Sequence, residues 1–116
     1  MAQDFRNALV ANVANLTYTG SNSSSAQTLW TGGDYDAIIG LRFANVTSSQ
    51  VNISVLLVNS GDFFLIKDAP IPAGASLELI DSGSKIVMKN GDVLKAYASA
   101  ANAVDAVISA VDTISA

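Results

Sequence analysis

Residues 36–45 have the sequence DAIIGLRFAN. In a β-strand, successive side chains point to opposite faces of the sheet. One face of this segment would therefore carry only apolar side chains, which are Ala37, Ile39, Leu41 and Phe43. An apolar period of two over ten residues predicts a strand that lays one face on a hydrophobic core.

Short apolar runs of the same kind follow along the chain, at residues 51–57, 63–67, 75–79, 85–89 and 92–98. The polar connection 47–50 predicts that the first two strands are antiparallel neighbours. Asn90-Gly91 between two apolar runs predicts a β-hairpin with a type I′ turn. Pro70 and Pro72 remove two backbone donors, so we expect residues 68–74 to form an extended crossing loop rather than a ladder strand.

The two ends of the chain fit more than one pattern. Residues 8–19 fit a strand and also a helical stripe, and the Thr/Tyr-rich end favours the strand. Residues 20–25 form a Ser-rich segment that we expect to be a mobile loop, before a short strand at 27–30. Residues 103–114 match both a helical template and a strand face, and the β-rich context favours a strand.

About eight strands without helical crossovers predict an all-β fold, a small antiparallel β-sandwich or jelly-roll-like domain. We expect residues 8–116 to form this single domain and residues 1–7 to be an N-terminal arm. A chain of 116 residues buries about 65% of its unfolded surface on folding. It can therefore build a core without disulfides.

Composition removes most catalytic chemistry, because the chain contains neither histidine nor cysteine. Ser-His-Asp sites, Cys-His sites, thiolate zinc sites and disulfides are all excluded. The single glutamate, Glu78, lies on the polar face of its predicted strand, and the aspartates fall mostly at turns and strand ends. We expect no catalytic residues and no enzymatic activity.

Charge and hydropathy argue against two classes of partner. The net charge is −4, and the six Lys and Arg residues are scattered, whereas nucleic-acid binding needs clustered cations. The first residues lack a basic segment followed by an apolar one, so we expect no secretory signal. No apolar run approaches the ~18 residues of a membrane span. We expect neither nucleic acid nor membrane as a partner.

One loop has a spacing compatible with a metal ion. Asp34 and Asp36 place two carboxylates two residues apart, as a Ca²⁺ loop can do. The EF-hand pattern is incomplete, because no glutamate follows at the required offset, so a strand-initiating loop is the favoured interpretation. We expect no metal ion and no cofactor.

Only 14% of the residues are charged, against about 25% in an ordinary soluble domain. A surface with so few charges can consist of uncharged polar side chains, or it can be buried against other subunits. Aromatic residues near a terminus or a loop are the candidates for reaching a neighbouring subunit, together with the arm. We predict partner contacts at Phe5, Arg6, Trp30 and Tyr35.

Four segments together resemble small virion structural proteins of tailed bacteriophages, especially phages of marine bacteria and cyanobacteria. They are LTYTG at 16–20, DAIIGLRFAN at 36–45, IKDAPIPAGASL at 66–77 and KIVMKNGDVLK at 85–95. The resemblance covers most of the chain from about residue 8. It implies a β-sandwich without catalytic role, present in many copies on a capsid, neck or tail, and it assigns no functional residues.

The expected function is therefore that of a capsid decoration (cement) protein. Its partners would be the major capsid protein or other virion proteins and further copies of itself, with a trimer as one expected form. It would reach the virion in the host cytoplasm and leave by lysis. A neck, tail or fibre-attachment component is the alternative within this class, and a carbohydrate-binding module is the alternative outside it.

Overall fold

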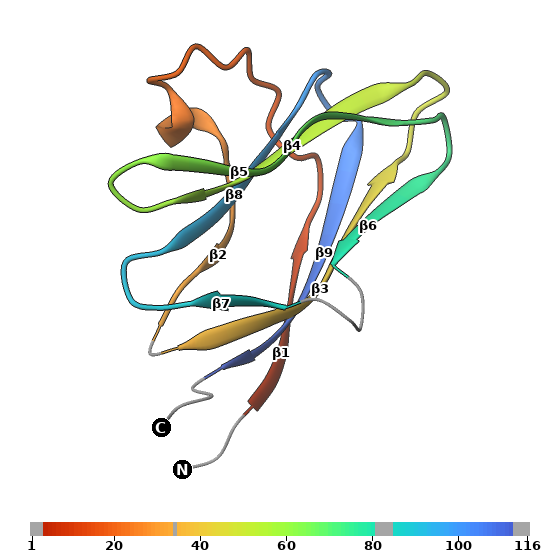
Figure 1. Ribbon diagram of the computed structural model, residues 1–116. Helices are drawn as coiled ribbons and strands as arrows, with labels where there is room; N and C mark the ends of the chain where they lie inside the picture. The colour runs from red at the N-terminus through yellow and green to blue at the C-terminus, as the bar shows by residue number, and fades with distance from the viewer. Residues whose placement is uncertain (1–3, 34, 81–84, 113–116) are drawn as a thin grey trace.

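The computed structural model describes residues 4–33, 35–80 and 85–112 of the chain. Two antiparallel sheets pack face to face as a sandwich (Figure 1), which confirms the predicted fold class. The described residues form nine strands rather than about eight. These are β1 (Asp4–Val10), β2 (Gln27–Thr31), β3 (Asp36–Asn45), β4 (Val51–Val58), β5 (Asp62–Ile71), β6 (Ser76–Ile80), β7 (Ile86–Met88), β8 (Val93–Ala98) and β9 (Val104–Asp112).

The first sheet has the strand order β1-β9-β3-β6. β7 also pairs with β3, at residues 36–38, whereas β6 pairs with it at residues 41–44. The second sheet has the order β2-β8-β4-β5. Most strands that follow each other in sequence therefore lie in different sheets. All seven residues of β1 pair with β9, so the first and last described strands lie side by side in Figure 1.

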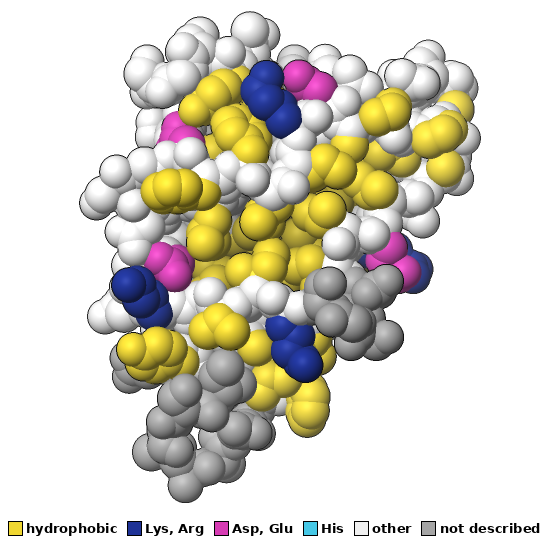
Figure 2. Space-filling view, in the orientation of Figure 1, with side chains coloured by type: hydrophobic (Ala, Val, Ile, Leu, Met, Phe, Trp, Pro, Cys, Tyr) yellow, Lys and Arg dark blue, Asp and Glu magenta, His cyan; other side chains and the backbone are white. Residues whose placement is uncertain are grey.

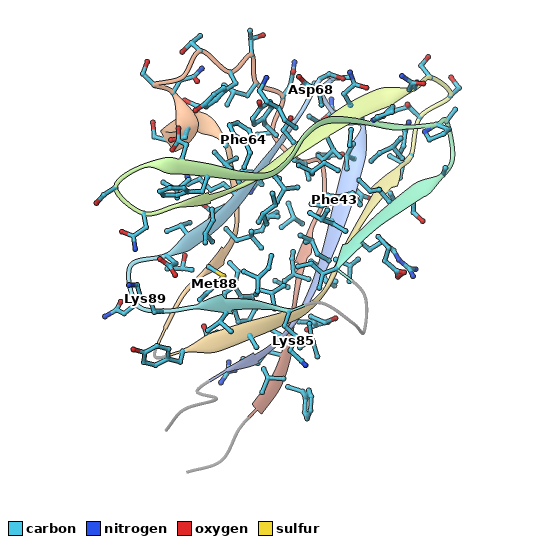
Figure 3. The ribbon with its side chains drawn as sticks, in the orientation of Figure 1. Phe43, Phe64, Asp68, Lys85, Met88 and Lys89 are labelled. Atoms are coloured by element: carbon cyan, nitrogen blue, oxygen red, sulfur yellow. The ribbon has the colours of Figure 1, made fainter. Side chains whose placement is uncertain are left out.

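The core lies between the two sheets. Its largest fully buried side chains come from both layers, and they include Ile38, Leu41, Phe43, Ile53, Leu94 and Ile108. Figure 3 shows Phe43 in this space, with Met88 pointing inward and Lys89 pointing away. A second, smaller cluster forms on the outer side of the second sheet, where Leu16 and Tyr18 of the coil after β1 cover Leu56 and Tyr97.

A β-bulge changes which side chains of β3 face the core. Ile38 and Gly40 pair with consecutive residues of β9, so Ile39 is an extra residue in the ladder. The inward alternation therefore shifts by one position. Ile38 is buried before the bulge, and Leu41 and Phe43 are buried after it. The prediction that Ala37 and Ile39 share the inner face is wrong. Ala37 lies in register with Val111 and Val87 on the outer face, and Ile39 is half-buried and lines a surface groove.

The connection from β3 to β4 crosses between the sheets, so the prediction that these strands are antiparallel neighbours is wrong. The buried amide of Asn45 organises this crossing. Its Nδ2 donates to the carbonyl oxygens of Ser49 at 2.7 Å and Ile71 at 2.9 Å. Its Oδ1 accepts the backbone N–H of Thr47 at 3.0 Å. The side chain supplies the partners that a ladder would otherwise provide.

The Asn90-Gly91 turn also joins two sheets rather than two paired strands. β7 ends at Met88, before the turn, and pairs with β3, whereas β8 pairs with β2 and β4. The predicted hairpin is therefore wrong. The backbone N–H of Asp92 donates to Lys89 O at 3.0 Å, and Gly91 has a φ of +99°. A positive φ at the second central position alone is typical of a type II turn, not of type I′.

The predicted crossing loop around the prolines is largely a strand. β5 continues through Pro70, which pairs with Asn52 of β4. Proline is tolerated there because β5 is the edge strand of its sheet, and the missing N–H faces away from β4. The β4–β5 turn lies at the predicted place, with Asn59 N–H donating to Gly61 O at 3.0 Å.

At the N-terminus, residues 4–7 belong to β1 and not to an arm, because they pair with β9 in register. The strand ends at Val10, so a single strand over 8–19 is also wrong. Residues 104–112 form β9, which confirms the strand there, and residues 113 and 114 lie outside the described range. The segment 20–25 contains a short 3-10 turn, η1 (Ser23–Ser25). Before this turn, Asn22 Nδ2 donates to Thr17 O and Asn22 Oδ1 accepts the Thr19 N–H.

Candidate interaction surface

Apolar side chains line up across the outer face of the first sheet. Residues that pair in neighbouring strands point to the same face. The pairs place Phe5, Val111, Ala37 and Val87 in one row across β1, β9, β3 and β7. A second row begins with Leu9 and Val107, and the row of Asn7, Ser109 and Gly40 lies between the two. We define the outer apolar face by its exposed or half-exposed large members, which are Phe5, Leu9, Val87, Val107 and Val111.

The members of this face are unusually open to solvent. Phe5 is 81% exposed, Leu9 71%, Val87 57% and Val107 43%. A shallow groove of about 420 Å³ runs beside Phe5, and it is lined by Phe5, Arg6, Asn7, Ile39, Ser109 and Ala110. Scattered exposed apolar residues are ordinary, whereas interaction sites gather exposed apolar side chains on one face, so this face is the candidate surface.

An ion pair borders the outer apolar face. Arg42 follows Val107 in the second row, and the next strand places Glu78 beside it, where the two side chains form an ion pair. Both side chains are at least half exposed, at 57% and 50%. Such a pair contributes little to stability in water. It gives this side of the face a polar border without net charge.

The four predicted contact residues divide into two groups. Phe5 and Arg6 lie together on β1 and line the same groove. Trp30 is half-buried, and its Nε1–H donates to Asp36 Oδ2 at 2.9 Å, so its indole is part of the fold's own packing. Tyr35 is 49% exposed and has a φ of +63° at the start of β3. The groove therefore unites Phe5 and Arg6 and does not include Trp30 or Tyr35.

Of the two candidate Ca²⁺ ligands, Asp36 already binds groups of the protein itself. Asp36 is only 4% exposed, and its Oδ2 accepts the Gly33 N–H at 3.0 Å as well as the Trp30 indole N–H. Asp34 lies outside the described residues. Within the described ranges, no group of three or more acidic residues could hold a metal ion. The carboxylate of Asp36 anchors the β2–β3 connection.

Asp92 is a second buried carboxylate with a structural role. Its Oδ2 accepts the Lys89 N–H at 3.0 Å, and its Oδ1 accepts Asn59 Nδ2 at 2.6 Å. The Lys89 bond, and next the Asn59 bond, lower the pKa of Asp92 from its ordinary value. Hydrogen bonds donated to the ionised form account for this direction. The carboxylate holds the β7–β8 turn against the β4–β5 turn.

Replacing Asp92 with asparagine should make stability less dependent on pH. Because the folded pKa is lowered, the carboxylate stabilises the fold above the unfolded pKa, about 3.9, and this stabilisation is lost as pH falls through the folded pKa. Asp92→Asn should therefore be less stable than the wild type at pH 7, and the difference should narrow as the pH falls below 4. Urea unfolding at pH 7, 5 and 3 measures this. A constant difference would contradict it.

Three aromatic side chains form a cluster on the outer side of the second sheet. Tyr18 stacks on Tyr97 with ring centroids 5.8 Å apart, and the Phe64 ring lies nearly perpendicular to Tyr18 with centroids 5.1 Å apart. The Tyr18 hydroxyl donates to Asp62 Oδ2 at 2.7 Å; this bond, followed by burial, raises the pKa of Tyr18. The rings cover each other, so this cluster fixes the coil after β1 rather than offering a flat stacking platform.

A further apolar region opens between the sheets on the side where β5 and the strands β6 and β7 form the borders. Figure 2 shows hydrophobic side chains gathered in a hollow at the centre of this side, with charged side chains around its border. Ile66, Leu77, Leu79 and Ile86 are partly buried there against the core. Leu65 is 39% exposed. The core is thus closed less completely here than in the middle of the sheets.

Sequence reasoning missed Leu9, Val87 and Val107. The signal for Val107 was present, because a strand over 104–111 with Val104, Ala106, Ile108 and Ala110 inside leaves Val107 and Val111 outside. A strand with apolar residues on both faces indicates that the second face is also covered. For Leu9, the register of β1 against β9 was needed, and no sequence pattern supplies it.

No protein-family model matches this chain, no curated protein matches its sequence, and no solved structure matches its fold. In the part of the chain that the structure describes, no helix is long and apolar enough to span a membrane.

Proposed function

We propose that this chain is a non-enzymatic virion structural protein of a tailed bacteriophage. More specifically, we propose a capsid decoration protein that docks on the assembled shell and stabilises it. The observation that supports docking is the outer apolar face, with Phe5 and Leu9 more than 70% exposed. The observation that supports the virion is the resemblance of segments 16–20, 36–45, 66–77 and 85–95 to phage structural proteins.

A decoration protein needs a rigid fold and a surface that binds the shell, and it needs no catalytic site. Covering apolar surface contributes about 25 cal/mol per Å² removed from water. The outer apolar face provides such surface on a sheet, whose backbone is held on both sides except at its edges. The Arg42–Glu78 pair would lie at the rim of the contact, where charges tune specificity more than affinity. The partner is the major capsid protein or another virion protein.

Stripped particles provide the test of this proposal. Gentle removal of the protein should lower the temperature at which the particles release DNA without changing the shell, and adding purified protein back should restore it. Val107→Lys, on the outer apolar face, should weaken rebinding at least tenfold. Phe63→Lys is the matched control, because Phe63 is 61% exposed but lies on β5 of the other sheet. Equal rebinding of both variants would contradict docking through this face.

A position at the neck or tail is the second candidate in the same class. The outer apolar face serves this candidate equally, because neck and tail proteins also bury apolar surface against neighbours. The two positions differ in stoichiometry, since a shell carries hundreds of equivalent sites and a neck or tail junction a dozen or fewer. The number of copies per particle therefore separates them.

A further inference from the structure

The sandwich has open strand edges, and most of them carry a feature that prevents pairing with another chain. Bulges, prolines, lysines and short length are the usual protective features. β5 carries Lys67 and Pro70 and has a φ of +53° at Asp68. β2 has a register shift between Thr28 and Trp30. β6 has five residues and β7 has three.

The edge of β1 differs from the others. It has seven residues, contains no proline or lysine, and pairs with β9 without any register shift. Phe5, Asn7 and Leu9 alternate along its outer face, and all three are exposed. A regular, exposed and partly apolar edge is a template for adding another strand.

The sequence of β1 is complementary to itself. A two-fold axis at Asn7 is the arrangement that pairs all seven residues of β1 with an antiparallel β1 from a second copy. In this register Phe5 lies opposite Leu9 of the second copy, and Leu9 lies opposite its Phe5. Directly opposed side chains on one face are the pairs that stabilise a sheet. The two most exposed large apolar side chains among the described residues would therefore cover each other.

Charge favours the same register. Arg6 lies opposite the small side chain of Ala8, so no like charges face each other directly. An axis at Arg6 would instead place two arginines opposite each other, which is destabilising. Because each β1 would meet the same surface of its partner, the contact is isologous and closes at two copies.

We propose that two copies of this chain form a two-fold dimer through β1, which joins their first sheets into one continuous sheet. This deepens the proposed function and rests on its expected self-association, but it favours a dimer over a trimer. The outer apolar faces of the two copies then meet across the two-fold axis, where Phe5 and Leu9 partly cover each other. Val87, Val107 and Val111 of both copies remain on one continuous face for a shell or neck partner.

A single introduced thiol tests the register, because the natural chain has no cysteine. Directly opposed residues in antiparallel strands have Cα atoms about 4.5–5.5 Å apart, within the range of about 4.4–6.8 Å that disulfides bridge. Asn7→Cys should therefore form a covalent dimer under mild oxidation at micromolar concentration. Thr28→Cys, exposed on the β2 edge, is the matched control and should stay mostly monomeric. Equal cross-linking of both would overturn the register.

Sedimentation equilibrium of the protein without tags tests the dimer itself. The wild type should show twice the chain mass of 11.9 kDa. Leu9→Lys, which places a lysine opposite Phe5 in both symmetric pairs, should weaken dimerisation about tenfold, while Phe63→Lys should leave it unchanged. A wild-type monomer at 100 μM, or an oligomer that Leu9→Lys does not weaken, would overturn the proposal. Neither result bears on how many copies a virion carries, so the two proposals fail separately.

Discussion

Replacing Asn45 with alanine should lower the free energy of unfolding by about 3–4 kcal/mol. Asn45 is 2% exposed, and its amide bonds the carbonyl oxygens of Ser49, Ile71 and Pro72. Its Oδ1 accepts the N–H of Thr47 at 3.0 Å and the hydroxyl at 2.7 Å. Alanine would leave these groups without partners at the place where the chain crosses between sheets.

Urea unfolding followed by tryptophan fluorescence measures this loss, since Trp30 is the one tryptophan. Asn15→Ala is the matched control, because Asn15 is exposed, and it should change stability by less than about 0.5 kcal/mol. Thr47→Ala removes part of the same network and should fall between the two variants. A loss at Asn45 no larger than that at Asn15 would contradict the role given to the amide.

Replacing Gly32 with alanine should cost about 2–4 kcal/mol, because backbone would have to move. A Cβ at this position would lie 2.4 Å from Lys89 O and 3.1 Å from Asp92 O, both main-chain atoms. The Gly32 N–H donates to Asp92 O at 2.8 Å. The close approach of the β2–β3 connection to the β7–β8 turn therefore requires a residue without a side chain.

The neighbouring glycine provides the control. A Cβ at Gly33 would meet only the Asp36 carboxylate oxygens, at 3.6 and 3.7 Å, which is ordinary contact. Gly33→Ala should therefore be nearly neutral, whereas Gly32→Ala should shift the urea midpoint clearly downward. Similar midpoints for both variants would show that the two connections can separate without cost.

The sequence predicted where most strands lie but not how they pair. Alternation over 36–45 and 51–57 located β3 and β4, because a half-buried strand imposes a period of two on its own residues. Pairing depends on residues far away in the chain. The partners of β3 are β9, β6 and β7, and no local pattern identifies them.

Individual errors have local physical causes. The extra residue at Ile39 shifts the inward face of β3 by one position, and such a bulge leaves no mark in composition. The connection after β3 crosses to the other sheet instead of turning back, and the Asn45 side chain stabilises this crossing. A single asparagine in the sequence does not predict such a role. Asn90-Gly91 predicted a turn correctly, yet the strands around it belong to different sheets.

The candidate surface was predicted in part. Phe5 and Arg6 were selected because they lie near a terminus, and the structure places them in one groove. Trp30 was selected as an aromatic residue near a loop, but its indole N–H donates to Asp36 within the fold. Leu9 and Val107 can be recognised as members of one face only when the register of β1 and β9 is known, since side chains from several strands form this face.

The number of copies of this chain per virion tests the central proposal most directly. Purified particles from the phage lysate that contains this chain would be analysed by quantitative mass spectrometry against the major capsid protein. A capsid decoration protein predicts hundreds of copies per particle, in fixed proportion to the shell subunit. A dozen or fewer copies would move the chain to the neck or tail, and its absence from purified particles would contradict the virion role altogether.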